Sequence, residues 1–233
     1  MKSLATKGLV GLATSSAVAG GIGIAIKFSS SKKELKSIRT LIKKHSPSQR
    51  LLFREDKGAA DGSSSEWKRV WKQYRTDFQN SSNNPFKLTL AKVSDIQDEA
   101  APENFMTSCS SLFEEKVEGI KSDKYQVVEK YCTRLTSVSD LISDSGKRVL
   151  PKGNDGQSQE WKELWKRYRK DNEDKKSEGG IWKLSDSSWN ENENLVEAPS
   201  KFREKCESES QVKTGDINHH SFTNVLNYCS VPI

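Results

Sequence analysis

The segment EWKRVWKQYR, Glu66–Arg75, returns later in the chain as EWKELWKRYR, Glu160–Arg169. Both copies place apolar residues at positions i, i+3, i+4 and i+7, the spacing of one face of an α-helix. Ser64 and Ser158 precede the two copies, where a helix N-cap is favoured. The repeated segment therefore predicts one amphipathic helix in each half of the chain.

The aromatic residues of these two helices are expected to anchor hydrophobic cores. A large aromatic ring buries about 150 to 250 Å², which matters in a chain that is 33% hydrophobic and 30% charged. The basic residues Lys68, Arg69, Lys72 and Arg75 are expected to remain in solvent. The predicted core anchors are Trp67, Trp71, Tyr74, Trp161, Trp165 and Tyr168.

Further matches flank this segment in the same order. SIRTLI, Ser37–Ile42, matches SVSDLI, Ser137–Ile142, and YQVVEKYC, Tyr125–Cys132, matches FTNVLNYC, Phe222–Cys229. These matches predict a tandem duplication and a mainly α fold, with three or four helices in each of two homologous small domains. The expected organisation is an N-terminal anchor at 1–27, a linker at 28–36, repeat unit one at 37–136 and repeat unit two at 137–233.

Two details of the units are less regular. Residues 87–93, KLTLAKV, alternate in polarity like a short strand, although the matching part of repeat unit two is too polar to indicate one. Pro102 and Pro199 suit the first position of a second helix in each unit.

Residues 8–26 form an uncharged run after Lys2 and Lys7. At a rise of about 1.5 Å per residue, a helix of this length just crosses a hydrocarbon layer of about 30 Å. We expect a transmembrane or signal-anchor helix and a single-pass protein of the cell membrane. A cleaved signal peptide, with Ala17 and Ala19 in an A-x-A arrangement, and a buried helix of a soluble fold remain alternatives.

Each unit has two cysteines on predicted inner helix faces, at matching positions. Bridges between them would stabilise each unit by about 3 to 4 kcal/mol; the alternative is that they are small buried hydrophobic residues. Bridges indicate the oxidising side of a membrane, so the repeats are expected to be extracellular. The excess of Lys and Arg after the apolar run favours the cytoplasmic side instead. The proposed disulfide residues are Cys109, Cys132, Cys206 and Cys229.

No catalytic, cofactor-binding or metal site is predicted. Cys206, His219, His220 and Cys229 are close in sequence, but their spacing matches no compact zinc motif. The interleaved Trp and Lys residues would suit stacking on nucleic-acid bases, but helical spacing separates the rings from the charges. Repeat unit one has 17 basic and 14 acidic residues and repeat unit two 15 and 17, so neither unit is strongly basic and no nucleic-acid partner is expected.

The Lys-flanked anchor, the EWKxLWKxYR-type segment, the WKL step at 182–184 and the YC ending followed by SVSDLI resemble a family. Over nearly its whole length the chain is similar to the paralogous membrane-anchored proteins of haemotropic mycoplasmas, bacteria without a cell wall that live on red cells. The resemblance implies surface variation or host contact, with host surface or plasma proteins as partners, and carries over no catalytic residues.

We therefore expect a non-enzymatic, membrane-anchored surface protein that binds host components or serves in antigenic surface display. The alternative is a cytoplasm-facing, membrane-anchored scaffold or nucleic-acid-associated protein, favoured by the basic residues after the apolar run.

Overall fold

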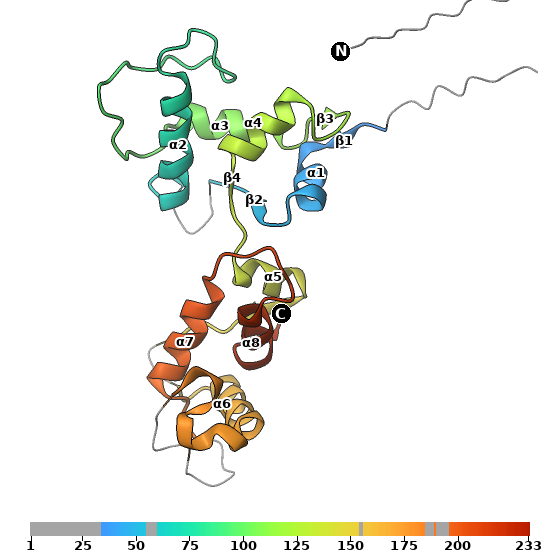
Figure 1. Ribbon diagram of the computed structural model, residues 1–233, viewed down its shortest axis with the longest axis vertical. Helices are drawn as coiled ribbons and strands as arrows, with labels where there is room; N and C mark the ends of the chain where they lie inside the picture. Colours follow the sequence, from blue (N-terminus) through green and yellow to red (C-terminus); the bar gives the residue numbers. More distant parts are fainter. Residues whose placement is uncertain (1–33, 55–59, 154–155, 185–188, 190–195) are drawn as a thin grey trace, which may run out of the picture. The chain divides into compact units, whose positions relative to one another are not determined.

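The chain is mainly helical, with a few very short strands beside the helices (Figure 1). The computed structural model describes residues 34–54, 60–153, 156–184, 189 and 196–233. The anchor predicted at 8–26 lies outside the described residues. Within the described ranges, no helix combines the length and the apolar character that a membrane span requires.

The described residues of repeat unit one form four α-helices, and three of them, α1, α2 and α4, begin after a serine N-cap. The repeated segment forms the longest helix, α2, whose N-cap Ser64 accepts a hydrogen bond from the backbone N–H of Trp67 at 3.3 Å, as the sequence predicts. In chain order the elements are β1 (Lys36–Ser37), α1 (Ile38–His45), β2 (Gln49–Leu51), α2 (Ser65–Phe78), α3 (Glu103–Leu112), β3 (Lys116–Val117), α4 (Asp123–Tyr131) and β4 (Thr133–Leu135).

Repeat unit two follows the same order of α-helices. The repeated segment forms α6 here, and its N-cap Ser158 accepts a hydrogen bond from the backbone N–H of Trp161 at 3.2 Å. It adds two 3-10 helices, η2 and η3, where repeat unit one has irregular backbone. The elements are α5 (Val138–Asp144), β5 (Lys147–Val149), α6 (Gln159–Asp171), η2 (Glu173–Glu178), η3 (Gly180–Trp182), α7 (Ser200–Ser210), α8 (His220–Tyr228) and β6 (Ser230–Pro232).

The strand pairings are also repeated. β2 pairs antiparallel with β4, with Arg50 opposite Arg134, and β5 pairs antiparallel with β6, with Arg148 opposite Val231. The β1–β3 pair has its counterpart in the single antiparallel bridge between Ser137 and Lys213. These pairings join the first residues of each unit to its second half, since the two strands of a pair lie far apart in the sequence.

Each unit has its own hydrophobic core, organised around its last helix. Helix α4 packs against α1, α2 and α3, and α8 packs against α5, α6 and α7. The aromatic packing is reproduced closely: the rings of Trp71 and Phe105 lie 5.0 Å apart, as do those of Trp165 and Phe202. The domain boundaries at 37–136 and 137–233 remain predictions.

The strand predicted at 87–93 is wrong. Within the part of the chain that the structure describes, this segment pairs with no strand, and side chains bind its backbone instead. The N–H of Leu88 donates to Asn84 Oδ1 at 2.8 Å, and the N–H of Val93 donates to Gln79 Oε1 at 3.1 Å. Pro102 and Pro199 are one position earlier than predicted, at the N-caps of α3 and α7.

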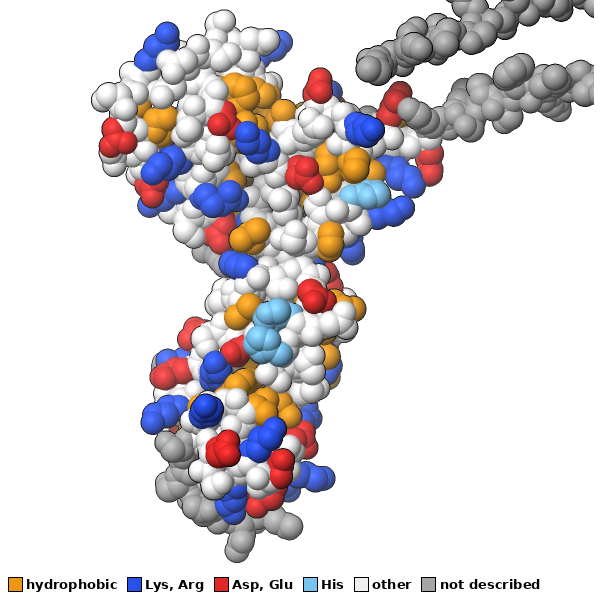
Figure 2. All heavy atoms as spheres, in the orientation of Figure 1, with side chains coloured by type: hydrophobic (Ala, Val, Ile, Leu, Met, Phe, Trp, Pro, Cys, Tyr) orange, Lys and Arg blue, Asp and Glu red, His pale blue; other side chains and the backbone are white. Residues whose placement is uncertain are grey.

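Charged side chains of both signs are interspersed over the face of the molecule shown in Figure 2, with small hydrophobic patches between them. Mixed charge of this kind is typical of a surface that keeps a protein soluble without forming a large field of one sign.

Candidate functional site

The four cysteines form two disulfides, Cys109–Cys132 and Cys206–Cys229. All four residues are fully buried. In each unit one cysteine lies within a helix, α3 or α7, and the other is the C-cap of the last helix rather than part of its face. Their role is therefore structural: each bridge ties the third helix of a unit to the end of the fourth.

The six predicted aromatic anchors are buried in the two cores. Their exposed fractions are 6% or less. Burial raises the pKa of Tyr74 and of Tyr168 to about 12, so both hydroxyls stay protonated near neutral pH. These rings support the two hydrophobic cores.

Arg75 corrects one expectation, because it is buried rather than in solvent. Its guanidinium lies 5.4 Å from the centre of the Trp71 ring and 2.9 Å from the carboxylate of Glu99. Arg169 occupies the same place in repeat unit two, 5.7 Å from the Trp165 ring. In both helices the arginine covers the outer edge of the aromatic core with its stem and its charged plane.

The two histidines near the C-terminus have a local structural role. His219 caps α8, where its Nδ1 accepts the backbone N–H of Ser221 at 3.2 Å, and its ring stacks on that of His220. The neighbouring cysteines are bonded to each other. Among the described residues, no group of His, Cys, Asp and Glu side chains has a geometry suited to a metal ion.

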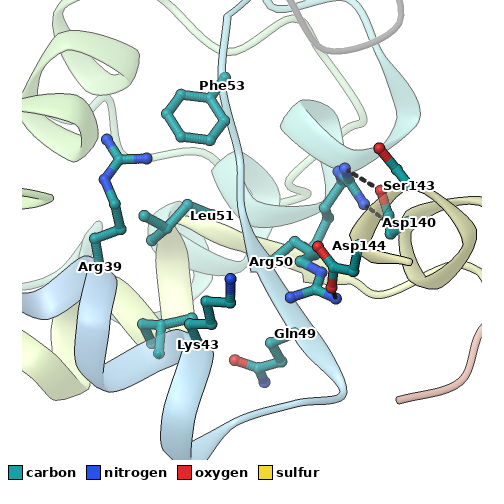
Figure 3. Close-up of a pocket in the computed structure, with 11 residues that line it drawn as sticks. Arg39, Lys43, Gln49, Arg50, Leu51, Phe53, Asp140, Ser143 and Asp144 are labelled. Carbon is teal, nitrogen blue, oxygen red and sulfur yellow. Dashed lines mark hydrogen bonds and ion pairs between the residues drawn. The ribbon is translucent and has the colours of Figure 1, made fainter. Parts of the chain in front are cut away.

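A cleft of about 390 Å³ is the strongest candidate for a binding site (Figure 3). Helix α1 contributes Arg39 and Lys43 on one side of strand β2, and α5 contributes Asp140, Ser143 and Asp144 on the other. We call these the α1 wall and the α5 wall. The cleft therefore combines residues from the beginning of repeat unit one and the beginning of repeat unit two.

Backbone hydrogen bonds hold the two walls together. The N–H of Thr136 donates to the carbonyl of Ser48, and the N–H of Thr214 donates to the carbonyl of Thr136, both at 2.9 Å. Gly215 is required at this junction, because a Cβ atom there would lie 2.5 Å from the backbone nitrogen of Ser48.

The acidic residues of the α5 wall are already paired. Arg134 forms a bidentate pair with Asp140, at 2.6 and 3.0 Å, and Arg50 lies 2.6 Å from Asp144. Burial alone would raise the pKa of Asp140, but Arg134 and the N–H and hydroxyl of Ser137 stabilise the carboxylate, and its pKa falls from 3.8 to about 2. Asp140 thus stays ionised, with its charge neutralised by Arg134, across the physiological pH range.

Asp140→Asn is expected to lower the free energy of unfolding by about 1 to 2 kcal/mol, because it removes the bidentate, charged contact that Asp140 makes with the half-buried Arg134. Since the pKa of Asp140 is depressed on folding, its contribution is present above about pH 4 and is lost as the pH falls toward about 2. Urea unfolding at several pH values should show the difference from wild type shrinking over that range. Asp144→Asn is the matched control; its carboxylate is more exposed, so about 0.5 kcal/mol or less is expected. Equal effects of the two variants would contradict the role of Asp140.

The cleft could not be found by sequence motifs, because its residues come from three separate short segments. One signal was nevertheless present. When the SIRTLI–SVSDLI match is extended by one residue, Arg39 and Lys43 align with Ser139 and Ser143, so the two units differ in charge where their helical pattern is the same.

Comparison with family models, with curated proteins and with solved structures finds no match to this chain.

Proposed function

We propose that the chain is a non-enzymatic surface protein, anchored in the cell membrane by residues 8–26, with both repeat units outside the cell. The observation that carries this proposal is the pairing of all four cysteines in two buried disulfides at matching positions. Disulfides persist in oxidising compartments and are rare where thiols are kept reduced. A chain with little other core material gains most from such bridges, which supports an extracellular location.

The proposed role is binding of other proteins, or presentation of a variable surface. The resemblance to membrane-anchored proteins of haemotropic mycoplasmas favours host surface or plasma proteins as partners. The mixed charge seen in Figure 2 supports this role over association with nucleic acid, which requires a dense basic surface.

The alternative is a cytoplasm-facing, membrane-anchored scaffold. The observation that favours it is the series of basic residues that follows the apolar run, from Lys27 to Lys44, because positive residues tend to remain on the cytoplasmic side. The two candidates differ in the redox state expected for the cysteines.

The surface protein and the cytoplasm-facing scaffold can be distinguished by mass-spectrometric mapping of the cysteines in native membranes. Thiols are blocked before lysis, and no reductant is used. We expect Cys109 linked to Cys132 and Cys206 linked to Cys229. Protease added to intact cells should also release peptides from both units. Four blocked thiols, or complete protection from protease, would overturn the surface location and favour the scaffold.

A further inference from the structure

Strand β2 presents its edge to the cleft. All three of its residues, Gln49–Leu51, line the cleft. Successive side chains of a strand point to opposite faces, so a cleft that contacts three consecutive residues runs along the edge of the strand rather than over one face.

This edge is available for hydrogen bonding. β2 belongs to a two-stranded sheet in which β4 is its neighbour. The carbonyl of Ser48 and the N–H of Leu52 form hydrogen bonds on the β4 side of the strand. In an antiparallel ladder, residues alternate between bonding toward the partner strand and facing away from it. The N–H and carbonyl of Leu51 and the carbonyl of Gln49 therefore face away from β4. Within the described residues no strand pairs with that side of β2, and an added strand would find donors and acceptors there.

The floor beneath this edge is apolar. Ile42 and Leu51 are buried, and the half-buried Phe53 is held by an edge-to-face contact with Phe113 at 5.4 Å. Since alternate residues of an added strand point the same way, an apolar side chain of a peptide would lie on this floor while its neighbours face outward.

The α1 wall adds positive charge that the cleft does not neutralise internally. Arg39 lies 5.1 Å from the centre of the Phe53 ring and pairs with Glu114, but both partners of that pair are largely exposed, so a ligand carboxylate can replace Glu114 at little cost. The amino group of Lys43 has no ion-pair partner among the described residues. Because Asp140 and Asp144 are engaged by other arginines, the field of the α1 wall favours a negatively charged ligand.

Repeat unit two lacks these features at the matching positions. Ser139 and Ser143 stand where repeat unit one has Arg39 and Lys43. Pro151 takes the place of Phe53, because its carbonyl accepts from the indole N–H of Trp161 as that of Phe53 accepts from Trp67. The scaffold is thus repeated while the cleft chemistry is not, so we do not expect the described residues of repeat unit two to form a matching site.

We propose that the cleft binds an extended acidic peptide segment of a partner protein, with its backbone along the open edge of β2, an apolar side chain on the floor and carboxylates on Arg39 and Lys43. The inference rests on the binding role proposed above and gives the chemical class of the partner. It is independent of membrane location.

The test uses the full-length oxidised chain in detergent and a fluorescein-labelled peptide, Glu-Leu-Glu-Val-Glu-Leu-Glu, with fluorescence anisotropy as the readout. Saturable binding is expected. Replacing Arg39 and Lys43 together by Ser, the residues of repeat unit two, should weaken binding about tenfold. The matched control replaces Lys166 and Lys170 by Ser, because these residues are exposed on α6 with the same spacing and give the same change in net charge.

Equal losses in the two double variants would overturn the proposal, because the effect would then be one of net charge alone. Binding of a peptide with Lys in place of Glu, or equally tight binding of inorganic polyphosphate, would also overturn it. Free thiols in the cysteine mapping would remove the surface location but would leave this binding result unchanged, so the two failures are distinguishable.

Discussion

Tyr168→Ala is expected to lower the free energy of unfolding by about 4 kcal/mol, as is usual when a fully buried aromatic ring is removed. The ring lies at the centre of the aromatic core of repeat unit two, with its centroid 5.0 Å from that of Trp182, 5.3 Å from Phe202 and 5.2 Å from Tyr228. These neighbours come from three separate segments, so few of them can move inward to fill the cavity. Urea denaturation followed by far-ultraviolet circular dichroism measures the loss.

Tyr168→Phe separates the ring from the hydroxyl. The hydroxyl accepts the backbone N–H of Trp182 at 2.9 Å and donates to the carbonyl of Gly179 at 3.2 Å. Losing it leaves the backbone N–H of the half-buried Trp182 without a partner, at a cost of about 1 to 2 kcal/mol, whereas the carbonyl of Gly179 still accepts the N–H of Leu184 at 2.7 Å. If the Phe variant were as unstable as the Ala variant, packing of the ring would not be the dominant contribution, and the prediction would be wrong.

Comparing Tyr74→Ala with Tyr168→Ala tests the domain organisation. Tyr74 has the matching position, with its ring centroid 5.2 Å from that of Tyr131. If the predicted units unfold separately, hydrogen exchange should lose protection within 37–136 for Tyr74→Ala and within 137–233 for Tyr168→Ala. Loss throughout both ranges in each variant would mean that the units unfold as one.

The helical faces could be predicted because an apolar period of 3.6 is a strong signal over three turns, and the repeat doubled it. Arg75 could not be placed by that signal. It follows Trp71 by one helical turn, and a long side chain at such a position either extends into water or lies over the ring beside it. The choice depends on Glu99, which is distant in sequence and reaches the guanidinium only in the folded chain.

The strands are predicted poorly, because the real ones are missed and a strand is expected where none forms. Strands β1 to β6 are two or three residues long, too short for an alternation of polarity to be visible. Residues 87–93 do alternate, but no described strand pairs with them. A strand exists only where another strand accepts its hydrogen bonds, and pairing between the start and end of a unit is not encoded locally. The cleft could not be predicted for the same reason, since β2 becomes a strand edge only when it pairs with β4, which is distant in sequence.

Removing one disulfide, as Cys109→Ala with Cys132→Ala or Cys206→Ala with Cys229→Ala, is expected to lower the free energy of unfolding by about 3 kcal/mol in each case. Both bridges join cysteines 23 positions apart. Removing either bridge should therefore increase the conformational entropy of the unfolded chain by the same amount. Alanine is the suitable replacement, because all four sites are fully buried and a serine would add an unpaired hydroxyl. Denaturant unfolding of the two double variants and of wild type under non-reducing conditions measures the effect.

Removing both bridges should destabilise each unit by about 3 kcal/mol. Since native domains are stable by only about 5 to 15 kcal/mol, a clearly smaller folded fraction is expected in both units. The chain has few apolar residues to compensate for the lost stability, since it is 33% hydrophobic with 30% charged residues. Adding reductant to the wild-type protein should reproduce the effect, with exchange protection lost first around α3 and α4 or around α7 and α8. A reduced protein as stable as the oxidised one would contradict the structural role of the bridges, and a chain that folds equally well without them would give no reason to place it in an oxidising compartment.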